Sequence, residues 1–231
     1  SSPTKEPPRV RRRPILAGLA LGAMSYKPHL AVLVPLMLVA GREWRALAAT
    51  VASALGLAGA SIAAFGVAPW QAFLGKAADA TAVASSSSSD WHAVPSTLVM
   101  LKNLGVGDPY AGWLHAAVAA LAALAAMRIW ARPTGQRWRA AALALAALIA
   151  APYVRVYDFA LLAFPIAALA SRRHDADWQD KTVTALLWIT PAALFAMGRA
   201  APVGPLVLIA GLALVARRAA GVPVAQLIGR Q

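Results

Sequence analysis

The 231-residue sequence contains no cysteine, which excludes disulfide bonds, thiolate metal sites and cysteine nucleophiles. It also has few charged residues, which make up 13% of the chain, whereas a soluble globular protein carries about 25%. The 4 histidines lie far apart along the chain, so we expect no metal site built from them. These absences remove most familiar kinds of metal and thiol chemistry.

Apolar sequence takes the place of the missing charge. Hydrophobic residues make up 60% of the chain and the mean hydropathy is +0.61, values typical of a membrane protein. The net charge is +13, but the basic residues separate apolar runs and do not form a patch of the kind that binds nucleic acid. We therefore expect no nucleic-acid partner, and we predict a multi-pass protein of the cell (inner) membrane, in contact with membrane lipids.

The apolar runs predict helices that cross the membrane or turn back inside it. A spanning helix needs about 20 mainly apolar residues, and two runs meet this length, Trp44 to Phe65 and Ala111 to Trp130. Four further runs are shorter or interrupted: 14–40, 138–170, 182–197 and 203–216. All are rich in Ala and Leu and lack the alternation of a β-barrel, so we predict an all-α polytopic transmembrane protein.

Basic connecting segments predict the orientation of these runs. Most of the 22 Lys and Arg residues lie between runs or at the ends of the chain, as expected for segments on the cytoplasmic side. If all these segments are cytoplasmic, the runs 14–40 and 138–170 are hairpins with tips at Lys27 and Arg155. The predicted division is a basic cytoplasmic linker at 1–13, a transmembrane domain at 14–218 with an extracytoplasmic loop at 66–110, and a cytoplasmic tail at 219–231.

The two hairpins are too short to cross the membrane with each arm. Arms of about 12 to 15 residues span about 18 to 23 Å, less than the hydrocarbon core of about 30 Å. Polar, irregular backbone at that depth needs protein or a water-filled cavity around it, and short interrupted segments often mark a binding site. We therefore predict that "YKPH" (26–29) forms the floor of a cavity open to the outside, with "PYVRVYD" (152–158) beside it.

The first hairpin carries two candidate site residues. An ionisable side chain inside a membrane costs about 2.5 to 3.5 kcal/mol at a helix centre and usually has a function, which favours Lys27 as a binding residue. The alternative is that Lys27 extends to the outer headgroups. His29 follows in the same turn and belongs either to the same site or to the structural packing.

The second hairpin carries four candidates. Arg155 offers a planar fork for phosphate, and Asp158 is able to accept sugar hydroxyls or a proton. Tyr153 and Tyr157 are able to stack on a ring, although tyrosine is also common at the membrane interface. The alternative for the charged residues is an internal ion pair between Arg155 and Asp158 that closes the turn.

Three other polar groups carry weaker signals. One lies in the outer loop, where exposed polar and aromatic residues are common: Asp90, Trp91 and His92. A second is an acidic group in a predicted cytoplasmic connection, which we expect to be solvated: Asp175, Asp177 and Asp180. His115, near the outer end of a span, we expect to be structural.

Several stretches resemble glycosyltransferase family 87, whose members are membrane enzymes of the type C glycosyltransferase fold. The helix, "YKPH", helix and "GR.WRA" pattern of that family resembles "RPILAGLALGAMSYKPHLAVLVPLMLVAGREWRALAAT". Further similarity lies in "FGVAPWQAFL", "VPSTLVMLKNLGV" and "APYVRVYDFALLAFPIAAL". The resemblance implies transfer of a sugar, mannose or arabinofuranose, from a polyprenyl-phosphate donor to a glycolipid or polysaccharide acceptor on the extracytoplasmic face.

The resemblance also implies roles for individual residues. Lys27 and His29 would hold the donor phosphate and neutralise charge on the leaving polyprenyl phosphate, while Arg155 and Asp158 would contact phosphate and sugar. The implied transfer needs no metal or other cofactor and uses a carboxylate base. The catalytic set is therefore His29 and Asp158, and the substrate-binding set is Lys27, Tyr153, Arg155 and Tyr157.

Two departures from the family pattern concern acidic residues. Family members carry a catalytic aspartate in a first extracytoplasmic loop near the amino terminus, a region this sequence does not contain, and Val156 occupies a position that is often acidic. We therefore expect the chain to be the carboxy-terminal part of a longer protein. Two other functions remain open: a transporter or lipid flippase with a polar site within the membrane, and a non-catalytic membrane scaffold.

Overall fold

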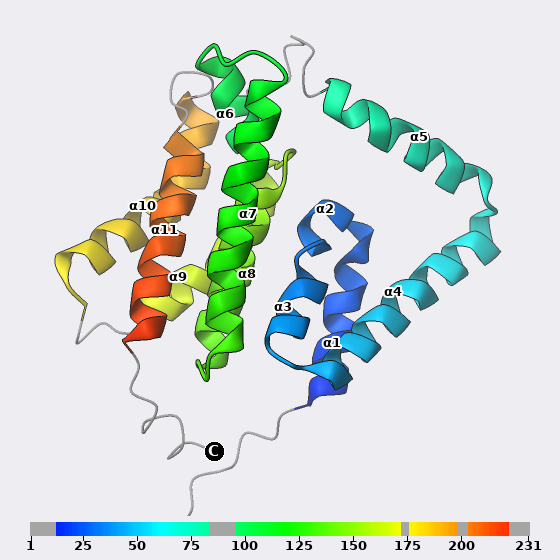
Figure 1. Ribbon diagram of the computed structural model, residues 1–231, viewed down its shortest axis with the longest axis horizontal. Coiled ribbons are helices and arrows are strands. Elements are labelled where there is room, and N and C mark those ends of the chain that lie inside the picture. Colours follow the sequence, from blue (N-terminus) through cyan, green and yellow to red (C-terminus); the bar gives the residue numbers. More distant parts are fainter. Residues whose placement is uncertain (1–12, 84–95, 172–175, 198–202, 222–231) are drawn as a thin grey trace, which may run out of the picture.

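The computed structural model describes residues 13–83, 96–171, 176–197 and 203–221, and every regular element in these ranges is helical. This confirms the predicted all-α class. The elements, shown in Figure 1, are α1 (Pro14–Ala23), the 3-10 helix η1 (Met24–Tyr26), α2 (Pro28–Ala31), α3 (Val34–Ala40), α4 (Trp44–Phe65), α5 (Ala68–Val83), α6 (Thr97–Asn103), α7 (Tyr110–Ala131), α8 (Gln136–Ala150), the 3-10 helix η3 (Val156–Leu162), α9 (Ala163–Ala170), α10 (Trp178–Met197) and α11 (Val203–Ala220).

In the described part of the chain, three helices are long and apolar enough to cross a membrane: α4 and α7, with 22 residues each, and α11, with 18. Two of them match the runs predicted to span. The third continues the run 203–216 to Ala220, and α10 likewise begins before the run 182–197, at Trp178. The length and composition of these helices confirm the prediction of a membrane protein.

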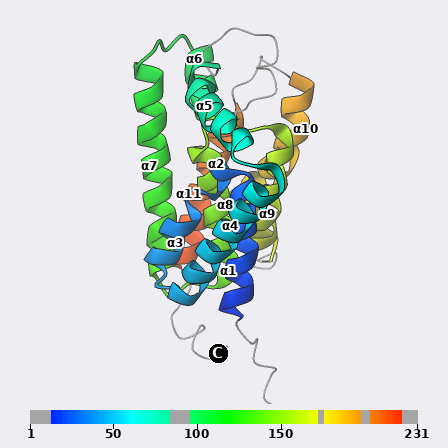
Figure 2. The ribbon, with the colours of Figure 1, turned by 90° about the vertical axis from the view of Figure 1, so that its right-hand side faces the viewer.

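Helix α8 lies at the centre of the bundle. It packs against α7, α9 and α11, and its side chains Leu145, Leu148 and Ile149 are fully buried. In Figure 2, α7 and α10 flank the bundle and α1 to α4 lie in front of it. Helix α5 leads away from the end of α4 toward α6 (Figure 1).

Both predicted hairpins are present and both are broken. The first runs from α1 through η1, α2 and α3, and it breaks at Lys27, where Pro28 begins the short helix α2. The second begins with α8, which ends at Ala150. The chain then has no regular structure up to Arg155 and returns through η3 and α9. Figure 1 shows the start of α1, the α3–α4 turn and the α7–α8 turn at one end of the structure, and both hairpins turn back before the other end.

Close contact between α1 and α4 holds the first hairpin against the spanning helix. A Cβ atom built on Gly18 would lie 2.3 Å from the carbonyl oxygen of Ala46, and one on Gly22 would lie 2.4 Å from that of Thr50. The hydroxyl of Thr50 donates to the Gly18 carbonyl at 3.1 Å. Glycines four residues apart allow this backbone approach, as they do in many membrane helix pairs.

We expect Gly22→Ala to destabilise the protein by about 1 to 3 kcal/mol, because the new methyl group forces α1 away from α4. Gly59→Ala is the matched control, since a Cβ at Gly59 meets nothing within 4 Å. The measurement is the thermal unfolding temperature of the purified protein in detergent. Equal unfolding temperatures for the two variants would show that the α1–α4 approach does not stabilise the fold.

The "GREWR" turn between α3 and α4 is anchored to α8. Glu43 accepts a hydrogen bond from the Arg139 guanidinium at 3.0 Å, and the same guanidinium donates to the Arg132 carbonyl at 3.0 Å. The indole of Trp130 donates to the Arg139 carbonyl at 2.9 Å, and its ring would lie 3.1 Å from a Cβ atom added to Gly41. This network joins the base of the first hairpin to the base of the second.

We expected the acidic group before and within α10 to be solvated, which is wrong for Asp180 but holds for Asp177, whose side chain is 43% exposed. The side chain of Asp180 is only 3% exposed and pairs with the Arg218 guanidinium at 2.5 Å. Asp177 lies 2.7 Å from the same guanidinium. The backbone N–H of Asp180, together with Arg218, lowers the pKa of Asp177. Asp175 lies outside the described residues.

Candidate functional site

The tips of the two hairpins meet at an ion pair. The ammonium of Lys27, between η1 and α2, lies 2.5 Å from Oδ1 of Asp158 in η3. These residues are 131 positions apart in the sequence. The Asp158 side chain is 2% exposed and that of Lys27 is 26% exposed, so the carboxylate is buried beneath a partly open ammonium.

The second oxygen of Asp158 closes the turn that begins η3. Oδ2 accepts a hydrogen bond from the backbone N–H of Arg155 at 2.9 Å, a local contact that a short acidic side chain makes readily at a helix start. In the described part of the chain, Asp158 therefore pairs with Lys27 and not with the Arg155 guanidinium. That guanidinium lies over the ring of Tyr153, with its Cζ 5.2 Å from the ring centroid.

Two further tyrosine rings border the Lys27 ammonium. Its Nζ lies 4.3 Å from the centroid of Tyr157 and 5.9 Å from that of Tyr26, both within range of a cation–π interaction. Both rings are largely exposed. The structure thus brings Tyr157 to the cluster as predicted and adds Tyr26, which the sequence did not single out although it directly precedes Lys27.

His29 contributes a polar atom without a partner among the described residues. Its Nε2 is buried and makes no hydrogen bond there, whereas buried polar atoms in proteins are normally paired. His29 lies in α2, two residues after Lys27, which is the N-cap residue of that helix, so His29 belongs to the same cluster. An unpaired buried nitrogen beside a cation is a suitable contact for one oxygen of a bound anion.

A small aromatic pocket adjoins the cluster. It has a volume of about 280 Å³ and lies between the tip of the first hairpin and the start of α5, with this lining: Ser25, Tyr26, Pro28, Pro69, Trp70 and Phe73. The Trp70 indole donates to the Ser61 hydroxyl at 3.3 Å, which ties α5 to α4. The pocket and the ammonium share Tyr26, so a ligand of the cluster has an aromatic surface beside it.

The other polar candidates lie elsewhere. His115 is buried on α7, and its Nδ1 makes no hydrogen bond among the described residues. The group Asp90, Trp91 and His92 lies outside the described residues. Within the described ranges, no three His, Cys, Asp or Glu residues come together as metal ligands, and metal independence stays a prediction.

The cluster combines two cations, a buried carboxylate, an unpaired imidazole nitrogen and three tyrosine rings at the tips of two broken membrane hairpins. Such an arrangement is suited to an anionic ligand with a ring attached. No curated protein and no solved structure matches the chain. The sequence does match glycosyltransferase family 87 over residues 7–154, a range that includes Lys27, His29 and Tyr153 and covers well over half of the chain. The chain therefore belongs to glycosyltransferase family 87 and is a membrane glycosyltransferase or part of one.

Proposed function

We propose that the cluster of Lys27, His29, Arg155 and Asp158 binds a polyprenyl-phosphate sugar and that the enzyme transfers mannose or arabinofuranose from it to a glycolipid or polysaccharide. The observation that carries this proposal is the partly exposed Lys27 ammonium over the buried Asp158 carboxylate at the tips of two short hairpins. A soluble nucleotide sugar would not need a site at this depth. A lipid-linked phosphate, held at the membrane surface by its isoprenoid chain, reaches it directly.

Lys27 and Arg155 supply the positive charge for the donor phosphate. Neither guanidinium nor ammonium is fully buried, so both are able to turn toward a ligand. Charge contacts at this depth are stronger than in water because the surrounding dielectric is lower. Tyr153 and Tyr157, which lie against the two cations, offer ring faces to the sugar.

In the transfer step, an acceptor hydroxyl oxygen forms a bond to the anomeric carbon of the sugar. The bond from that carbon to the phosphate oxygen breaks, and its electron pair leaves with the polyprenyl phosphate. Lys27, Arg155 and the free nitrogen of His29 stabilise the leaving phosphate. When Lys27 turns from Asp158 to the phosphate, Oδ1 of Asp158 becomes free to accept the hydroxyl proton.

This proposal places the site on the extracytoplasmic side of the cell inner membrane. The basic ends of the chain and the basic turns then lie in the cytoplasm, and residues 66–110 lie outside, where α5 borders the cluster. An acceptor approaches from the water side, past this segment. The donor approaches from the bilayer, so the two substrates enter from different directions.

We expect Arg155→Lys to reduce sugar transfer by the complete protein about ten-fold, because lysine keeps the charge but loses the planar fork. Arg155→Ala should reduce it further. The measurement is transfer of radiolabelled sugar from polyprenyl-phosphate mannose or polyprenyl-phosphate arabinofuranose to membrane acceptors, at matched expression. Arg128→Lys, a change on the spanning helix α7, is the matched control.

Two outcomes would contradict the proposed function. Equal activity in the wild type and both Arg155 variants would remove Arg155 from the site. Movement of the intact lipid-linked sugar across the membrane, without release of free polyprenyl phosphate, would instead indicate a transporter.

A further inference from the structure

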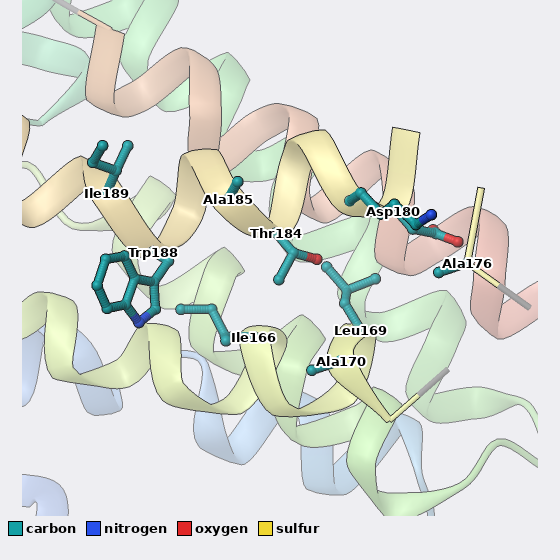
Figure 3. Close-up of a pocket in the computed structure, with 10 residues that line it drawn as sticks. Ile166, Leu169, Ala170, Ala176, Asp180, Thr184, Ala185, Trp188 and Ile189 are labelled. Atoms are coloured by element: carbon teal, nitrogen blue, oxygen red, sulfur yellow. The ribbon is translucent and has the colours of Figure 1, made fainter. Parts of the chain in front are cut away.

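A groove of about 650 Å³ lies between α9 and α10 (Figure 3). None of its lining residues belongs to the cluster at the hairpin tips. Most of the lining residues are apolar: Ile166, Leu169, Ala170, Ala176, Asp180, Lys181, Thr184, Ala185, Trp188 and Ile189. The proposed function does not use this groove.

The groove is charged at one end and, apart from Thr184, apolar along the rest of its length. Figure 3 shows Asp180 and Ala176 at one end and Trp188 and Ile189 at the other. From residue 181 to residue 189, α10 rises about 12 Å. Asp180 and Lys181 lie in the first turn of α10, the turn that faces the basic end of α11.

Among the residues that the structure describes, the polar end carries a surplus of positive charge. The carboxylates of Asp177 and Asp180 pair with the guanidiniums of Arg217 and Arg218, so these two negative and two positive charges neutralise one another. Lys181 is exposed and no acidic side chain in the described ranges pairs with its ammonium. The acidic member of the groove lining therefore does not repel an anion, and Lys181 remains available to bind one.

Trp188 marks the apolar part of the groove. Its side chain lies in the middle of α10 and is 73% exposed, whereas Trp130, Trp138 and Trp178 lie near helix ends. Tryptophan in membrane proteins usually lies at the interface with water. A tryptophan exposed in mid-helix and lining a groove presents a broad apolar face to whatever occupies that groove.

We propose that an anionic phospholipid binds this groove, with its phosphate at Lys181 and one acyl chain along Ala185 and Trp188. Basic pockets between membrane helices are known to bind anionic headgroups, and the surplus charge at the polar end provides the complement.

The test uses bromine atoms on lipid chains, which quench tryptophan fluorescence on contact. The complete protein is reconstituted in vesicles with equal amounts of phosphatidylglycerol and phosphatidylcholine, in which a fixed fraction of one lipid or the other carries dibrominated chains. Subtracting the signal of Trp188→Phe isolates the emission that depends on Trp188. We expect brominated phosphatidylglycerol to quench this emission about five times more effectively than brominated phosphatidylcholine.

Charge variants then test the role of Lys181. Lys181→Gln should abolish the preference for phosphatidylglycerol, and Lys181→Arg should keep it. Arg45→Gln is the matched control, because it removes an exposed positive charge near the start of α4, remote from the groove. Thermal unfolding confirms that each variant is folded before it is compared.

Three results would overturn the proposal. Equal quenching by the two lipids would mean ordinary contact with bulk bilayer. No quenching by either would mean that protein covers the groove. A preference that survives in Lys181→Gln would assign the headgroup to another residue.

Discussion

Lys27→Ala is expected to lower the affinity of the complete protein for a polyprenyl-phosphate donor at least ten-fold and to leave acceptor binding nearly unchanged. The ammonium is the charged group at the open face of the cluster, and its loss exposes the donor phosphate to the Asp158 carboxylate beneath it. Binding of a phosphate next to an uncompensated carboxylate is unfavourable at low dielectric. Donor affinity, measured by titration with a non-transferable donor analogue, is the quantity to compare.

A double variant separates this binding effect from a structural one. Lys27→Ala alone leaves Asp158, which is 2% exposed, without its ion-pair partner, and breaking a buried pair in this way costs about 3 to 5 kcal/mol of stability. Lys27→Ala combined with Asp158→Asn removes both charges, so stability should return. Donor affinity should stay low. Recovery of donor affinity together with stability would show that Lys27 acts only by neutralising Asp158.

Arg218→Gln should produce the largest loss of stability at the base of the bundle, about 3 kcal/mol. Arg218 donates from Nε at 2.8 Å and from Nη2 at 2.5 Å to the two oxygens of Asp180, which is buried. Removing the guanidinium leaves that carboxylate buried and unpaired. The measurement is the free energy of unfolding in a mixed-micelle denaturant titration.

Arg217→Gln is the control for this experiment. The side chain of Arg217 is 48% exposed against 20% for Arg218, and its contact with Asp177 is long, at 3.4 Å. An exposed pair of this kind contributes about 0 to 1 kcal/mol. Similar losses of stability for Arg217→Gln and Arg218→Gln would contradict the interpretation that the buried Asp180 makes the stabilising ion pair between α10 and α11.

The sequence predicts where the first membrane hairpin breaks, because a lysine followed by a proline interrupts an apolar helix whatever the rest of the fold. Pro28 has no N–H to continue the preceding helix, and Lys27 adds a charge in an apolar run, so the break at "YKPH" follows from neighbouring residues. The spans α4 and α7 follow from length and composition for the same reason.

Pairing between distant charges was not predictable in this way. The sequence predicts that Lys27 and Asp158 lie in adjacent hairpin tips, but the only ion pair that it suggested, as an alternative to a functional role, was the local one between Arg155 and Asp158. In the structure, Asp158 pairs instead with Lys27, across 131 positions. Local sequence offers no measure of which of two available cations a buried carboxylate selects.

Asp180 was missed for a related reason. Acidic residues beside basic ones in a connecting segment usually face water, and the partner that buries Asp180 is Arg218, 38 positions later. The α1–α4 contact, in contrast, had a visible signal in Gly18 and Gly22, four residues apart on one helix face.

The short hairpins have a consequence for the lipid around the protein. The apolar helices Pro14–Tyr26 and Pro28–Ala40 fall in the range of 10 to 17 residues, and 13 helical residues rise only about 20 Å. A bilayer next to such helices meets a hydrophobic mismatch of about 10 Å, which it relieves by thinning or by admitting water. In the orientation that we propose, we expect headgroups of the outer leaflet to sink toward Lys27 at this edge of the protein. The phosphate of the proposed lipid-linked donor would then reach the ammonium along the deformed membrane surface, while its isoprenoid chain stays in the bilayer.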